Sequence, residues 1–191
     1  MGRRYLVTGG AGFIGSNFIR HLLAQMDEYV ANGALVGLPF AFILAMVAVG
    51  LWGAQLGAPA IWLLPFTFPV VMAFGGMLGL MGVPLPGVEV GIALSGVLLG
   101  LAVLSEWRPP LWSSAVIVGF FAIFHGHAHG TELPAGASGL LYSIGFVAAT
   151  GTLHAIGIGI GVIHRWGWGR ATLRAAGACV ASAGAYFLWR A

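Results

Sequence analysis

Long apolar runs, broken at a few polar or proline-containing points, dominate the hydrophobic pattern of this chain. No charged side chain occurs between residues 30 and 88, and Glu89 alone interrupts the uncharged stretch that continues to Ser105. A helix of about 20 apolar residues is long enough to cross a bilayer. The punctuation indicates six candidate spans: residues 33–54, 59–81, 88–104, 110–128, 137–163 and 171–189. We therefore predict an all-α, polytopic membrane helix bundle with about six transmembrane helices.

Composition supports this class and excludes others. The chain of 191 residues is 59% hydrophobic and 7% charged, with a mean hydropathy of +0.96, whereas soluble domains carry about 25% charged residues. The lipid bilayer is thus the expected partner. The sequence leaves open whether the chain also forms a homo-oligomer. Eight arginines without any lysine are too few for a nucleic-acid surface, so we expect them to set membrane topology. The single cysteine, Cys179, excludes a disulfide framework within the chain.

Residues 1–29 differ from the rest, because they are richer in charge and read as strand, glycine turn and helix. The run at residues 4–17 closely resembles the opening of nucleotide-sugar dehydratases and epimerases, with Thr8, Gly9, Gly12 and Gly15 forming a TGxxGxxG motif. In that class the motif holds a cofactor pyrophosphate at a helix N-terminus. The acidic second strand and the remaining sheet are missing. We interpret residues 1–29 as a truncated, non-functional fragment grafted onto a transmembrane domain at residues 30–191.

The strongest candidate chemistry lies in residues 124–134, where His125, His127, His129 and Glu132 fall close together. On a continuous helix His125 and His129 share a face, and Glu132 follows on the same side. His127 would then point the opposite way, although a broken segment would let all three imidazoles converge. Such a set can chelate a divalent cation, but imidazole suits nickel, copper, zinc and iron alike. The simpler alternative is a polar helix end at the membrane interface.

For the other ionisable residues, a structural role competes with a role in metal binding. His154, alone in the fifth span, either hydrogen-bonds a neighbouring helix or faces a metal path, since ionisable groups at membrane depth tend to mark pathways. Glu89 opens the third span, where the helix dipole stabilises a carboxylate. His164 lies beside Arg165 and Trp166, a combination typical of the membrane interface.

From about residue 43 onward the sequence resembles the HupE/UreJ family of nickel permeases, small six-helix bacterial inner-membrane proteins linked to hydrogenase and urease maturation. The resemblance is carried by residues 44–52, 82–86 with Glu89, 124–134 and 153–157. It implies a metal-path role for His125, His129 and Glu132, with His127 and His154 as further candidates. It also implies a multi-pass transporter and no enzyme. Nickel, or else cobalt, zinc or copper, would be transported cargo, and no resident cofactor is expected.

One family motif is absent. Members carry HPxxGxDH in the first span, but the aligned positions here hold Leu35, Val36, Pro39, Ala41 and Phe42. Two imidazoles and a carboxylate are therefore replaced by apolar groups, which predicts a permease scaffold with impaired transport. The alternative is a non-transporting accessory or structural membrane protein of metalloenzyme maturation, for which replacing His125 and His129 would leave cation accumulation unchanged. An intramembrane metalloprotease would need a motif such as HExxH, which does not occur.

The arginines predict an orientation. If residue 30 is outside, Arg108, Arg165, Arg170 and Arg174 lie on or near cytoplasmic loops and Arg190 lies outside. The end of the bundle with His129 and Glu132 then faces the periplasm. The N-terminal arginines at positions 3, 4 and 20 favour the opposite orientation, which is a further reason for treating that segment as a graft.

Overall fold

The computed structural model describes residues 37–133 and 138–191, and all regular secondary structure in these ranges is helical. The elements are α2 (Gly37–Leu56), α3 (Ala60–Leu80), α4 (Val88–Ser105), α5 (Leu111–Thr131), α6 (Gly139–Gly161), the 3-10 turn η1 (Val162–Arg165) and α7 (Gly167–Arg190). Six α-helices in the described part correspond one to one with the six predicted spans. The predicted fragment at residues 1–29 lies outside the described residues.

Most of these helices are suited to a bilayer. Five of them in the described ranges, Ala60–Leu80, Val88–Ser105, Leu111–Thr131, Gly139–Arg165 and Gly167–Arg190, are long and apolar enough to cross a membrane. The apolar stretch described in α2, Ala41–Leu56, is shorter. Along α3 the large side chains Trp62, Phe66, Val70 and Phe74 recur at helical spacing and are more than half exposed. Such a face is stable in lipid, and the prediction of an all-α, multi-pass membrane bundle is confirmed.

Proline and glycine set the helix boundaries, as their local chemistry predicts. Helices α3 and α5 begin directly after Pro59 and Pro110. Helix α4 begins after Gly87, whose φ of 71° is a left-handed conformation that favours glycine. Two boundaries within the described residues differ from the prediction by more than two residues. Helix α5 continues through Gly130 to Thr131, which keeps His129 helical, and α7 begins four residues early at Gly167, directly after the extended Trp166.

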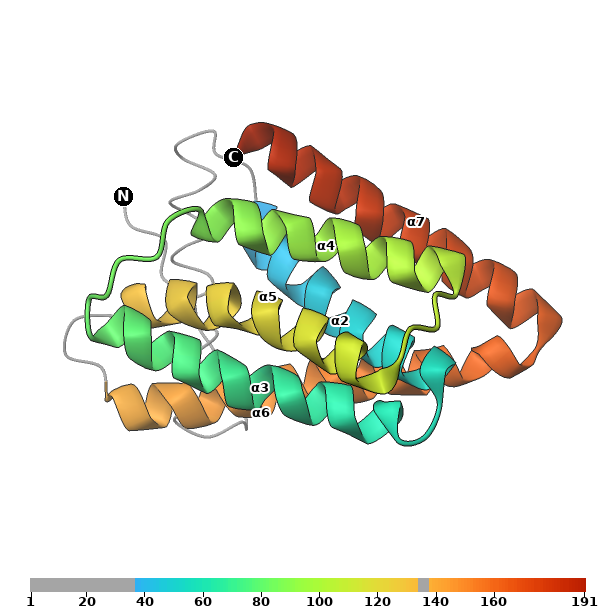
Figure 1. The fold of residues 1–191 in the computed structure, drawn as a ribbon, viewed down its shortest axis with the longest axis horizontal. Coiled ribbons are helices and arrows are strands. Elements are labelled where there is room, and N and C mark those ends of the chain that lie inside the picture. Colours follow the sequence, from blue (N-terminus) through green and yellow to red (C-terminus); the bar gives the residue numbers. More distant parts are fainter. Residues whose placement is uncertain (1–36, 134–137) are drawn as a thin grey trace, which may run out of the picture.

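The helices pack in three close pairs, α3 with α5, α4 with α7, and α2 with α6 (Figure 1). Two glycines show how close the backbones approach: a Cβ on Gly126 would collide with the carbonyl of Met72, and one on Gly157 with the carbonyl of Val47. Small residues at such positions let membrane helices associate. Helix α2 also packs against α3, α4 and α7, so its middle turns are buried in the centre of the bundle.

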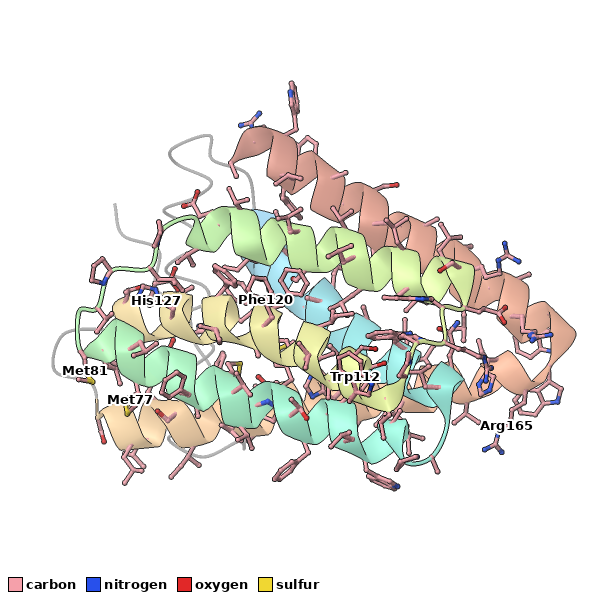
Figure 2. The ribbon with its side chains drawn as sticks, viewed as in Figure 1. Met77, Met81, Trp112, Phe120, His127 and Arg165 are labelled. Carbon is pink, nitrogen blue, oxygen red and sulfur yellow. The ribbon has the colours of Figure 1, made fainter. Side chains whose placement is uncertain are left out.

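The two ends of the bundle differ in chemistry. At one end Arg170 forms a salt bridge of 3.2 Å with Glu106, which joins the α4–α5 connection to the start of α7. Figure 2 shows Trp112 and Arg165 at this end, whereas His127, Met77 and Met81 lie at the opposite end. Arg108 lies in the same α4–α5 connection as Glu106, and Arg174 follows Arg170 by one helical turn. The arginines predicted to share one side of the membrane therefore lie at the same end of the bundle. We call this end the arginine end and the opposite one the histidine end.

Candidate metal-binding path

Helix α5 is continuous through its histidines, which decides where each imidazole points. The Nε2 atom of His127 donates a hydrogen bond of 2.7 Å to the carbonyl of Val83, in the α3–α4 connection. Residues 125 and 129 lie one helical turn apart on a different side of α5, where both rings contact Phe42. The structure thus has the continuous-helix arrangement, in which His127 does not converge with the other two histidines.

His125 has a fixed ring orientation and an available nitrogen. Its side chain is completely buried, and its Nδ1 donates a hydrogen bond of 2.9 Å to the carbonyl of Phe121. This bond makes Nδ1 the protonated nitrogen and leaves a lone pair on Nε2. Within the described residues, Nε2 has no hydrogen-bond partner. A neutral imidazole with one nitrogen anchored to a carbonyl is the usual form of a metal-binding histidine.

Phe42 contacts the rings of both α5 histidines from α2. Its ring centroid lies 5.0 Å from that of His125, edge to face, and 4.6 Å from that of His129. Ala41, beside it on α2, is also buried. The family resemblance predicts that these two positions correspond to the final aspartate and histidine of HPxxGxDH. Sequence reasoning identified the missing ligands but not that the replacement ring lies between the remaining ones.

A second phenyl ring continues the series inward. The centroid of Phe68 lies 5.2 Å from that of His125 and 5.4 Å from that of His154, both in edge-to-face geometry. We call the five side chains His129, Phe42, His125, Phe68 and His154 the ring row. Because α5 and α6 run in opposite directions (Figure 1), the ring row leads from the histidine end toward the middle of the bundle.

A cavity opens beside the outer member of the ring row. It has a volume of about 150 Å³ and is lined by Met72, His129, Tyr142 and Phe146, together with other residues of α3, α5 and α6. The Tyr142 hydroxyl lies 3.4 Å from Nδ1 of His129, and the ring centroids of His129 and Phe146 are 3.9 Å apart. The half-buried Glu132 ends α5 and interacts electrostatically with Tyr142. A phenol and an imidazole thus line this cavity, and the Glu132 carboxylate interacts with that phenol.

The predicted ligands do not form one closed cage. In the ranges that the structure describes, no three side chains of histidine, cysteine, aspartate or glutamate converge on a common metal position. His125, His129 and His154 are instead spaced along the ring row, Glu132 lies at its mouth, and His127 is turned away. The described residues thus offer separate donors rather than one enclosed metal site.

Two polar residues near these histidines were not singled out from the sequence. Tyr142 reaches His129 from α6, and Thr150, buried on the same helix, has a hydroxyl without a hydrogen-bond partner in the described structure. The sequence could have indicated Thr150, because it lies four residues before His154 in an apolar helix and so shares a helix face with that histidine. Glu89 is exposed in the first turn of α4, as expected for a charge that favours the helix dipole.

The fold and its interior together define a multi-pass helical membrane protein with imidazoles buried along one path. The profile of the family described as HupE / UreJ protein matches residues 30–187, and the chain belongs to this family. It is 47% identical over 163 residues to Protein HupE of Rhizobium leguminosarum bv. viciae, which covers 83% of this chain and 85% of the relative. No solved structure was found to be similar. Neither comparison relates residues 1–29 to a dehydratase, so the graft stays a hypothesis.

Proposed function

We propose that this chain is an inner-membrane permease for nickel or a related divalent cation (cobalt, zinc or copper) whose outer binding position is incomplete. The supporting observation is the Nε2 atom of His125, which is buried without a hydrogen-bond partner in the described structure. A buried polar atom left without a partner costs about 1–3 kcal/mol, and a passing cation would offset that cost. The family relationship supports the same function, since its members are linked to nickel supply for hydrogenase and urease.

The direction of transport follows from the two ends of the bundle. Cytoplasmic loops of bacterial membrane proteins carry an excess of arginine and lysine. The arginine end, with Arg108, Arg165, Arg170 and Arg174, is therefore proposed to face the cytoplasm. The cavity beside His129 and the carboxylate of Glu132 would then open toward the periplasm, where an importer collects its cation.

Phe42 and Ala41 are the physical basis for proposing impaired transport. The phenyl ring lies in contact with both α5 imidazoles, so it excludes a cation from the space between them. Structural and catalytic transition-metal sites generally use three or four protein donors, whereas His125 and His129 supply two. We therefore propose weak cation binding at this position.

Residues 1–29 are proposed to contribute no cofactor chemistry to the domain at residues 30–191.

Uptake of radioactive nickel by cells tests this function. Three versions are compared: the chain itself, H125A/H129A, and a version with the five motif positions changed to the family residues (L35H, V36P, P39G, A41D and F42H). We expect the double alanine variant to lower uptake to the background of empty cells and the restored motif to raise it. H164A is the matched control, because the ring of His164 bonds the Gly161 carbonyl at the arginine end, away from the ring row.

The alternative function is a non-transporting accessory protein of metalloenzyme maturation. It is favoured by Phe42 between the remaining ligands and by the lack of a three-ligand cage in the described ranges. The permease would be contradicted, and this alternative supported, if nickel uptake equals background in the chain itself and stays there in H125A/H129A, in the restored motif and in H164A. All versions must be present in the membrane at equal amounts.

A further inference from the structure

Helix α6 carries two buried polar side chains whose atoms lack partners. Thr150 and His154 are each only 1% exposed. The Thr150 hydroxyl and both ring nitrogens of His154 have no hydrogen-bond partner within the described residues. Because the two residues are four positions apart on one helix, they lie on the same face, one turn above the other. Buried polar groups are nearly always satisfied, so such a pair indicates a ligand that binds there.

Helix α3 presents a free backbone oxygen to the same place. Pro69 has no N–H group, so the carbonyl of Pro65, four residues earlier, lacks its α-helical hydrogen bond. This carbonyl approaches the His154 ring without reaching the geometry of a hydrogen bond. Pro69 thus leaves the Pro65 carbonyl without its helical partner, beside an imidazole that also lacks a hydrogen-bond partner in the described structure.

Phe68 separates this group from the outer imidazoles. Its fully buried ring makes edge-to-face contacts with His125 on one side and His154 on the other. A cation bound beside His154 would therefore not share ligands with one bound beside His125 while the phenyl ring is in place. The ring row then has two binding positions with an apolar barrier between them.

We propose that Thr150, His154 and the carbonyl of Pro65 form an inner binding position for a divalent transition-metal cation, separated from the outer imidazoles by Phe68. The inference deepens the proposed permeation and rests on it. One imidazole nitrogen and two neutral oxygens are a donor set that borderline cations such as Ni²⁺, Co²⁺ and Zn²⁺ accept, with water completing the coordination. The site carries no charged ligand, so it would hold its cation weakly enough to release it toward the arginine end.

Binding of Co²⁺ to the purified full chain in detergent, measured by equilibrium dialysis, tests the inner position independently of transport. Four variants are compared with the parent chain: T150V, H154A, P69A and H125A/H129A. T150V keeps the side-chain shape, and P69A restores the N–H that would bind the Pro65 carbonyl. T152V is the matched control, since Thr152 is exposed on the same helix and its hydroxyl already donates to the Ala148 carbonyl.

We expect H154A to remove one bound cation and H125A/H129A to remove a different one. T150V and P69A should weaken the inner cation by about tenfold, as loss of a supporting ligand does at other metal sites, and T152V should match the parent. The inner position is wrong if H154A and T150V bind as much Co²⁺ as the parent, or if H154A and H125A/H129A abolish the same single cation. In either case the proposed permeation survives if H125A/H129A lowers both Co²⁺ binding and nickel uptake. A parent chain that binds no Co²⁺ overturns both proposals.

Discussion

The phenyl ring of Phe42 meets the imidazole of His125 edge to face, with ring centroids 5.0 Å apart and ring planes at 87°. Phe42 belongs to the first helix described and His125 to the fourth, so this contact joins a position where the family motif is absent to the histidine segment of α5. In members with the full motif, a histidine at position 42 would lie against the α5 histidines. Because of this contact, we expect a substitution at position 42 to alter cation binding by the side chains of α5.

Replacing Phe42 with histidine should therefore strengthen cation binding. The new imidazole would lie beside His125 and His129 and supply a third donor, which we expect to raise Ni²⁺ affinity by about tenfold or more. Isothermal titration of the purified chain measures the change. F120H is the matched control, because Phe120 is exposed on the outer face of α5 (Figure 2). Equal gains in F42H and F120H would contradict a specific site at position 42.

His127 should prove to be structural. Its ring donates to the Val83 carbonyl and so ties α5 to the α3–α4 connection. We expect H127A to lower the free energy of unfolding by about 1 kcal/mol, the usual net value of a hydrogen bond, or somewhat more because the carbonyl loses its partner. Nickel uptake per molecule of folded protein should stay unchanged. A loss of uptake as large as that of H125A/H129A would show that His127 is a ligand.

The close pairing of α3 and α5 depends on Gly126. A Cβ at this position would overlap the Met72 carbonyl, so G126A must push the two helices apart or distort them. We expect a loss of about 1–3 kcal/mol in stability, typical of overpacking, measured as a lower midpoint of thermal unfolding in detergent. G151A is the control, because nothing lies within 4 Å of a Cβ at Gly151. If both variants unfold at the same temperature as the parent, the described helix contact is wrong.

Trp52 anchors the arginine end of α2. Its buried indole donates a hydrogen bond of 2.9 Å to the Trp107 carbonyl and stacks on the Trp107 ring with centroids 5.9 Å apart. W52F should cost about 1–3 kcal/mol, because the carbonyl loses its partner and the smaller ring leaves space. Thermal unfolding of W52F beside W62F checks this, since Trp62 is 75% exposed and its replacement should be nearly neutral. Equal destabilisation by both would contradict the role given to Trp52.

The helices were predictable because lipid requires continuous apolar runs, and the starts of two of them because Pro59 and Pro110 restrict the backbone. The shared face of His125 and His129 followed from helical spacing alone. The pairing of α3 with α5 did not, since an apolar run carries no information about which helix it meets. For the same reason, the positions of Phe42 and Phe68 between imidazoles, and the convergence of the Pro65 carbonyl with His154, emerge only from the packed structure.

The most direct test of the central claim, that the α5 imidazoles belong to a cation site whose α2 ligands are replaced in this chain, combines the two sets of substitutions in one cell line. Nickel uptake is measured for the restored motif (L35H, V36P, P39G, A41D and F42H) with and without H125A/H129A. Residues that share one site are not additive, so we predict that the alanines abolish the entire gain produced by the restored motif. A gain that persists undiminished without His125 and His129 would contradict a shared site.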